Sequence, residues 1–115
     1  METTREPEAA SGPEAALFLA EHLGRPLLAR TVGVKRRTLA NWLAGRADPS
    51  PRSLEQLHVT LATWETVATI EAPEVVRAWF MTMQDALDDY SPTDIIAAGR
   101  GADVVAVARA YVQRS

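Results

Sequence analysis

The sequence predicts an all-α protein, and two patterns carry this prediction. Apolar residues recur at intervals of three and four along most of the chain, as on one face of a helix, and strand-like alternation is absent. Serine or proline precedes several of these stretches and glycine follows them, which are typical helix start and stop signals. With 115 residues, 47% of them apolar, the chain can form one domain or two small helical subdomains.

The first predicted helix begins after Ser11. Ser11 and Glu14 have the spacing of a capping box, and Gly24 supplies the stop. The apolar stripe between them consists of Ala16, Leu19, Ala20 and Leu23. A second, short helix is expected over residues 27–32 and a third over residues 34–44, which Gly45 ends.

The fourth and longest predicted helix covers about residues 51–70, because Ser50 can cap it and Pro51 suits its first position. Its apolar residues form a narrow seam, which favours the core of the chain over a dimer interface. The seam consists of Leu54, Leu57, Leu61, Trp64 and Ala68. A fifth helix is expected from Pro73, a short one after Ser91 that Gly99 ends, and a last one over about residues 102–113.

Positive charge is concentrated in one block of the sequence. Residues 25–52 hold seven basic residues and one acidic residue, whereas residues 1–24 hold five acids and one base. Residues 53–115 hold nine acids and four bases. Such a block can attract a polyanion to one face while the rest of the chain repels it, although a solvated basic face has the same composition.

Residues 25–44 have the pattern of a helix-turn-helix. Ala29 falls where two helices meet closely, and Gly33 falls at the turn, where glycine adopts a positive φ at little cost. The apolar contact positions hold Leu28, Val32, Val34, Leu39 and Trp42. Agreement at all these positions in one register favours the motif over a helical hairpin that has no role with nucleic acid.

Assigning these residues inward leaves a basic, amide-bearing face on the second helix of the motif. Arginine can bond to guanine and asparagine to adenine, so this face can read bases. The candidate base-reading residues are Lys35, Arg36, Arg37 and Asn41. The candidate phosphate contacts are Arg25, Arg30, Arg46 and Arg52. Structural alternatives stay open, such as an Arg46 that bonds to carbonyls at the helix end.

One module of this size makes few contacts with DNA. We therefore expect a homodimer that reads half-sites about 34 Å apart or a multiple of that distance. The fourth helix and the last helix are the candidate interfaces, with the last helix preferred because Trp64 suits the core.

Residue patterns for catalysis, metals and membranes are missing from the sequence. His22 and His58 lack further ligands at metal spacing, and Asp88 and Asp89 have no nucleophile motif beside them. The sequence GRG at residues 99–101 lacks the strand and lysine of a phosphate loop, so these glycines are expected to end one helix and ease entry to the next. We expect no enzyme, metal or cofactor. No cysteine and no long apolar run occur, so we expect a cytoplasmic protein without membrane contact.

Two stretches resemble the Xre–MbcA–ParS antitoxin family. RRTLANWLAGRADP, residues 36–49, is similar to the helix-turn-helix of that family, and VVRAWFMTMQDALDDYSPTDIIAAGRGADVV, residues 75–105, to its toxin-binding region. The matching residues of the second stretch are Trp79, Leu87, Ser91, Pro92, Ile95, Ile96, Gly99, Val104 and Val105. The segment MTMQD stands where the family often has a proline–asparagine pair.

The resemblance implies an antitoxin that blocks a RES-domain, NAD-consuming toxin and represses their shared promoter. It adds Thr38 to the DNA-binding residues and Trp79 to the toxin-binding ones. Tyr111, Gln113 and Arg114 are further candidates for partner binding, because tyrosine and arginine often anchor interfaces. The alternatives are a regulator without a toxin, whose second half only dimerises or binds another protein, and an interaction module that no longer binds DNA.

These predictions divide the chain into three parts. Residues 1–10 form a flexible acidic tail, residues 11–72 a DNA-binding domain, and residues 73–115 a helical partner-binding region.

Overall fold

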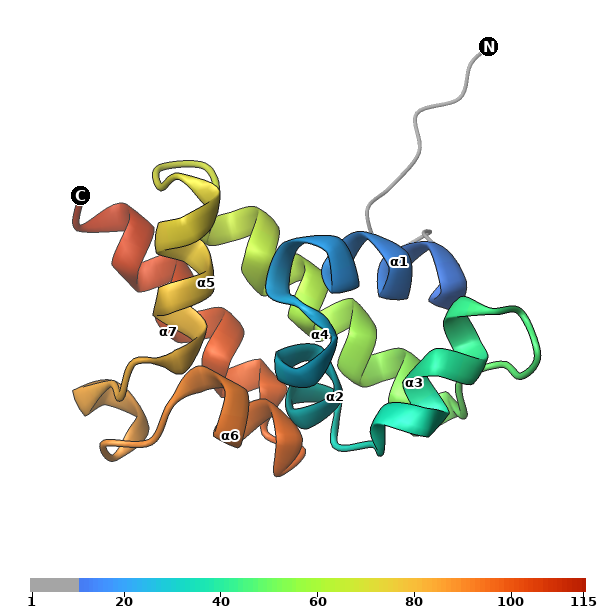
Figure 1. Cartoon of the computed structure of the whole chain (residues 1–115). Helices are drawn as coiled ribbons and strands as arrows, with labels where there is room; N and C mark the ends of the chain where they lie inside the picture. Colours follow the sequence, from blue (N-terminus) through green and yellow to red (C-terminus); the bar gives the residue numbers. More distant parts are fainter. Residues whose placement is uncertain (1–10) are drawn as a thin grey trace, which may run out of the picture.

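The computed structural model describes residues 11–115, and the predicted tail lies outside this range. Within it, regular structure is helical apart from one isolated β-bridge between Gln84 and Tyr90. The elements are α1 Gly12–Leu23, α2 Arg25–Val32, α3 Arg36–Leu43, α4 Pro51–Val67, α5 Pro73–Met81, the 3-10 turn η2 Asp85–Leu87, α6 Pro92–Ala97 and α7 Gly101–Gln113 (Figure 1). The prediction of an all-α fold is confirmed.

Serine caps begin three of these helices. Ser11 accepts a bond from the backbone N–H of Glu14 at 3.1 Å, and the Glu14 carboxylate accepts one from the backbone N–H of Ser11 at 3.0 Å. Ser50 and Ser91 each accept a bond at 3.1 Å from the backbone N–H three residues further on. Each bond satisfies an N–H that has no partner inside the helix. The predicted caps are confirmed.

The helix ends differ from the predicted ones by a few residues. The third helix starts at Arg36 rather than Val34, because Lys35 is extended at φ −73° and ψ 153° and serves as its N-cap. The fourth helix ends at Val67 and continues as a turn to residue 70. None of the helices within residues 11–115 combines the length and the apolar character that a bilayer crossing needs.

All of the helices contribute to one hydrophobic core around α4. Leu57, Leu61 and Trp64 of the predicted seam are buried, whereas Leu54 is half-buried at its edge and Ala68 is exposed. The middle of the seam therefore packs inside the chain and is not available to a second copy.

Polar residues share the buried face of α4, which the apolar periodicity did not predict. Thr60 and Thr63 donate their hydroxyls to carbonyls four residues earlier, at 2.7 and 2.9 Å. Gln56 donates its amide to the backbone carbonyl of Ile96 at 2.6 Å. Because each donor has a partner, its burial does not leave an unsatisfied group in the core.

Helix α7 packs closely on α4 at Gly101. A Cβ at residue 101 would lie 2.4 Å from Val59 Cγ1, which is closer than two carbon atoms approach. The absence of a side chain thus allows the two helices to touch. This contact, rather than ease of helix entry, is the structural reason for a glycine at residue 101.

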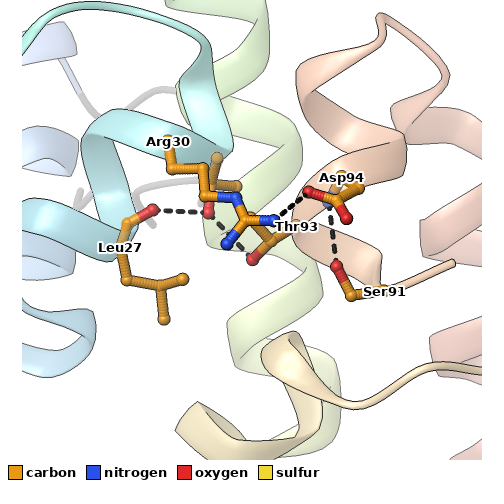
Figure 2. Close-up of polar contacts among 6 residues, drawn as sticks. Leu27, Arg30, Ser91, Thr93 and Asp94 are labelled. Carbon is orange, nitrogen blue, oxygen red and sulfur yellow. Dashed lines mark hydrogen bonds and ion pairs between the residues drawn. The ribbon is translucent and has the colours of Figure 1, made fainter.

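Helix α6 binds to α2 through polar contacts (Figure 2). Arg30 Nη2 lies 2.7 Å from Asp94 Oδ1, and the buried hydroxyls of Thr31 and Thr93 are 3.0 Å apart. Thr31 also donates its hydroxyl to the carbonyl of Leu27 at 2.7 Å. Because the hydroxyl hydrogen of Thr31 is used in that bond, the oxygen of Thr31 accepts the bond from the hydroxyl of Thr93. The two regions that the sequence suggests, residues 11–72 and residues 73–115, therefore pack against each other.

Candidate nucleic-acid interface and partner surface

Helices α2 and α3 are joined by the turn that the sequence predicts. Gly33 is left-handed at φ 75° and ψ 35°, and the backbone N–H of Val34 donates to the carbonyl of Ala29 at 3.0 Å. Ala29 is buried at the junction, where a larger side chain would separate the helices. The positions that the pattern assigns inward are buried or, for Val34, half-buried: Leu28, Val32, Val34, Leu39 and Trp42.

The opposite face of α3 carries the candidate base-reading residues. Lys35, Arg36 and Arg37 are exposed, and Thr38 and Asn41 are half-buried. Clustered cations around an amide are suited to a polyanion that also presents hydrogen-bonding edges, as the major groove of DNA does.

Arg46 positions the amide of Asn41 on this face. Its Nε donates to Asn41 Oδ1 at 3.2 Å, so the amide oxygen is already oriented, and its second lone pair and the NH₂ group stay available. The side chain of Arg46 therefore bonds to the side chain of Asn41, whereas the bond of Arg46 to a helix-end carbonyl comes from its backbone N–H, which donates to the carbonyl of Asn41 at 2.9 Å.

The other flanking arginines are distributed around the two helices. Arg25 is exposed at the start of α2, and Arg52 is exposed at the start of α4, with Nη2 near Gly99. The guanidinium of Arg30 pairs with Asp94 of α6, and the Arg30 side chain is still 66% exposed, so its phosphate contact stays a prediction.

The predicted partner-binding residues lie in different environments. Trp79 is buried, with its ring centroid 5.9 Å from that of Phe80, so it belongs to the core and does not present its ring to a partner. Gln113 and Arg114 are exposed at the end of α7.

Tyr111 is half-buried beside them and donates its hydroxyl to the carboxylate of Glu71. This hydrogen bond, aided by burial and the negative charge of Glu71, raises the pKa of Tyr111 above its ordinary value of 10.0. The bond also ties the end of α7 to the turn that follows α4.

Three large exposed side chains next to this region were not among the predicted site residues. Met81, Met83 and Tyr90 are 47%, 72% and 57% exposed, on and just after α5. They belong to the sequence MTMQDALDDY, residues 81–90, in which apolar and polar residues are mixed without helical periodicity. Within residues 11–115 no His, Asp or Glu residues gather in a group that could hold a metal ion.

The described residues form a small all-α protein. Its helices α2 and α3, which are joined by a turn at Gly33, carry a basic face. Its particular fold is similar to that of a chain in the crystal structure of the M. tuberculosis MbcT–MbcA toxin–antitoxin complex, at a TM-score of 0.74 and 19% identity. The match covers 89% of this chain and 94% of the other. This chain therefore shares the fold of a chain in that complex, which supports the resemblance at the level of fold. No protein-family model and no curated protein matches the sequence.

Proposed function

We propose that this chain is an antitoxin that binds operator DNA through α3, neutralises a RES-domain, NAD-consuming toxin, and represses the promoter that they share. The exposed basic face of α3 on an antitoxin-like fold carries this proposal. The chain acts by binding rather than catalysis, as a cytoplasmic protein.

The proposed DNA contacts fall into two classes. Arg36, Arg37 and Asn41 read base edges from the outer face of α3, where Lys35 and Thr38 add contacts beside them. Arg25, Arg46 and Arg52 contact phosphates, which sets the position of the helix without reading sequence. A homodimer supplies two copies of this face, and an apolar groove of about 410 Å³ between α4 and α7 is the candidate dimer surface.

Affinity for the promoter fragment upstream of the gene tests the DNA part of the proposal. Arg37→Ala and Asn41→Ala should each weaken specific binding by about 1–3 kcal/mol and relax selectivity at one base pair. Arg52→Ala should weaken binding to all DNA sequences. It should also reduce the slope of log affinity against log salt concentration by about the amount expected for one phosphate contact.

Arg109→Ala is the matched control, because it removes an exposed arginine from the last helix and leaves α3 intact. Wild-type affinity in the Arg37 and Asn41 variants would refute the assignment of α3. Light scattering of the free chain and of its DNA complex tests the homodimer, and a monomer in both would exclude it.

Suppression of toxicity tests the antitoxin part. Co-expression of the whole chain with the RES-domain protein of the adjacent gene should restore growth and retain that protein on an affinity column. A chain that binds the promoter but neither retains nor neutralises that protein would instead be a transcriptional regulator without a toxin.

A further inference from the structure

The connection between α6 and α7 brings an arginine from the second half of the chain close to the helix-turn-helix. Residues 53–115 hold nine acids and four bases, so this part of the chain as a whole repels a polyanion. Its four bases are Arg77, Arg100, Arg109 and Arg114. Arg100 lies in the connection that runs from the end of α6 to the start of α7, residues 97–101, which we name the 97–101 loop.

The 97–101 loop touches the turn that precedes α3. A Cβ at Gly33 would lie 3.7 Å from the carbonyl oxygen of Ala97, so the turn and the loop are in contact. Figure 1 shows them side by side at the lower edge of the molecule, next to the start of α3. Lys35 and Arg36 follow Gly33 by two and three residues and are exposed. The loop therefore adjoins the basic face of α3.

The same loop packs against the start of α4, where Arg52 lies. A Cβ at Gly99 would lie 3.8 Å from Nη2 of Arg52. Arg52 and Arg100 line one hollow of about 220 Å³ between the start of α4 and the start of α7. Buried Gln56 lines it too, and its bond to the carbonyl of Ile96 holds the end of α6 against α4. Two guanidinium groups thus share one edge of the molecule, which continues from the face of α3.

Arg100 is held in place before any ligand binds. The N–H of Gly99 donates to the carbonyl of Ile96 at 2.9 Å, and the N–H of Arg100 donates to that of Ile95 at 3.0 Å. These bonds fix the backbone of the loop, so binding does not have to order it.

The ion pair of Arg100 orients its guanidinium without using all of it. Nε and Nη2 lie 3.0 and 2.9 Å from Oδ2 of Asp103, which leaves the Nη1 group and one N–H of Nη2 for another acceptor. The two side chains are 55% and 52% exposed, so water screens their attraction and a second acceptor can share the arginine at little cost.

We infer that the DNA interface continues from α3 onto the 97–101 loop, where Arg100 contacts the phosphate backbone beside Arg52. The inference rests on the proposed DNA binding and adds a contact from the half of the chain that resembles a toxin-binding region. Arg100 sets the position of the DNA without reading sequence, because phosphate oxygens are alike at every base pair. Glu55 also lines the hollow, so its carboxylate keeps the backbone at the rim, against the guanidinium groups.

The test measures the affinity of the purified whole chain for the promoter fragment and for an unrelated duplex of the same length, over a series of salt concentrations. Arg100→Ala should weaken binding to both duplexes about three- to tenfold. It should also reduce the slope of log affinity against log salt concentration by about the amount expected for one phosphate contact. Arg100→Glu should weaken binding further, because it adds a repelling charge.

Three variants serve as comparisons. Arg100→Lys keeps the charge and should retain most of the affinity, which separates a loss of charge from damage to the loop. Asp103→Asn removes a carboxylate from the same edge and should strengthen binding to both duplexes. Arg109→Ala removes an exposed arginine further along α7 and should bind as wild type does.

Three results would overturn the inference, and they are distinguishable. If Arg100→Ala and Arg100→Glu bind both duplexes as wild type does, the loop lies outside the interface and the contacts proposed for α3 stand. If Arg100→Ala weakens binding to the promoter fragment alone, the residue reads bases and is not a phosphate contact. If the wild-type chain binds neither duplex, the proposed DNA binding fails and the inference fails with it.

Discussion

Replacement of Gly101 by alanine tests the closest contact between α4 and α7. The added Cβ would lie 2.4 Å from Val59 Cγ1 and 3.2 Å from Val59 Cβ and Cγ2. Alanine favours a helix over glycine by up to about 1 kcal/mol, whereas overpacking a contact costs about 1–3 kcal/mol. Valine has essentially one rotamer in a helix, so Val59 cannot turn away and the clash outweighs the helix preference.

We therefore expect Gly101→Ala to lower the free energy of unfolding by about 1–2 kcal/mol. For a chain of this length, that loss corresponds to about 4–8 °C in Tm. Thermal and urea unfolding followed by circular dichroism measure both quantities.

Val59→Ala in the same chain should relieve the clash. On its own this variant loses a half-buried side chain and should cost about 1 kcal/mol, yet the double variant should be more stable than Gly101→Ala. A Gly101→Ala chain as stable as wild type, or a double variant without recovery, would refute the close contact as the reason for this glycine.

Other expected outcomes concern hydrogen bonds described above. Thr31→Val should destabilise the chain by about 1–2 kcal/mol in urea unfolding, because it leaves the buried hydroxyl of Thr93 without its acceptor. Thr93→Val should cost less, because the hydroxyl of Thr31 keeps its bond to the carbonyl of Leu27. Equal losses in the two variants would contradict this direction of bonding. Ser91→Ala should cost about 1 kcal/mol through loss of the α6 cap, and an unchanged Tm would contradict it. The raised pKa of Tyr111 stabilises the fold below pH 10.0, and this contribution should disappear as the pH rises through the folded-state pKa. The Tyr111→Phe variant, which cannot bond to Glu71, should lose stability less steeply than wild type above pH 10.0. Parallel curves of unfolding free energy against pH for the two chains would disprove the link between the pKa of Tyr111 and stability.

Local signals in the sequence predicted most of the fold. Caps act within a few residues, so Ser11, Ser50 and Ser91 could be assigned without knowledge of tertiary structure. The turn at Gly33 was predictable for the same reason, because its left-handed backbone is a local requirement.

Contacts between distant segments could not be predicted in this way. The pairing of Arg30 with Asp94 depends on α6 packing against α2, and no spacing in the sequence encodes it. Trp79 looked like an anchor for a partner, but an aromatic residue at helical spacing can equally fill the core, as it does here. Met83 and Tyr90 belong to a segment without periodicity, so only the fold reveals that their side chains are exposed.

The α2–α6 contact affects how the protein responds to proteolysis. Thr93 and Ile96 of α6 cover Thr31 and Gln56, so removal of α6 would take away the acceptor of the Gln56 amide and uncover the apolar side of α2. A protease cut in the loop at residues 82–91 would therefore destabilise the basic face of α3 along with the segment beyond the cut. A cell that degrades this protein would lose both of its proposed activities, promoter repression and toxin neutralisation, in the same step.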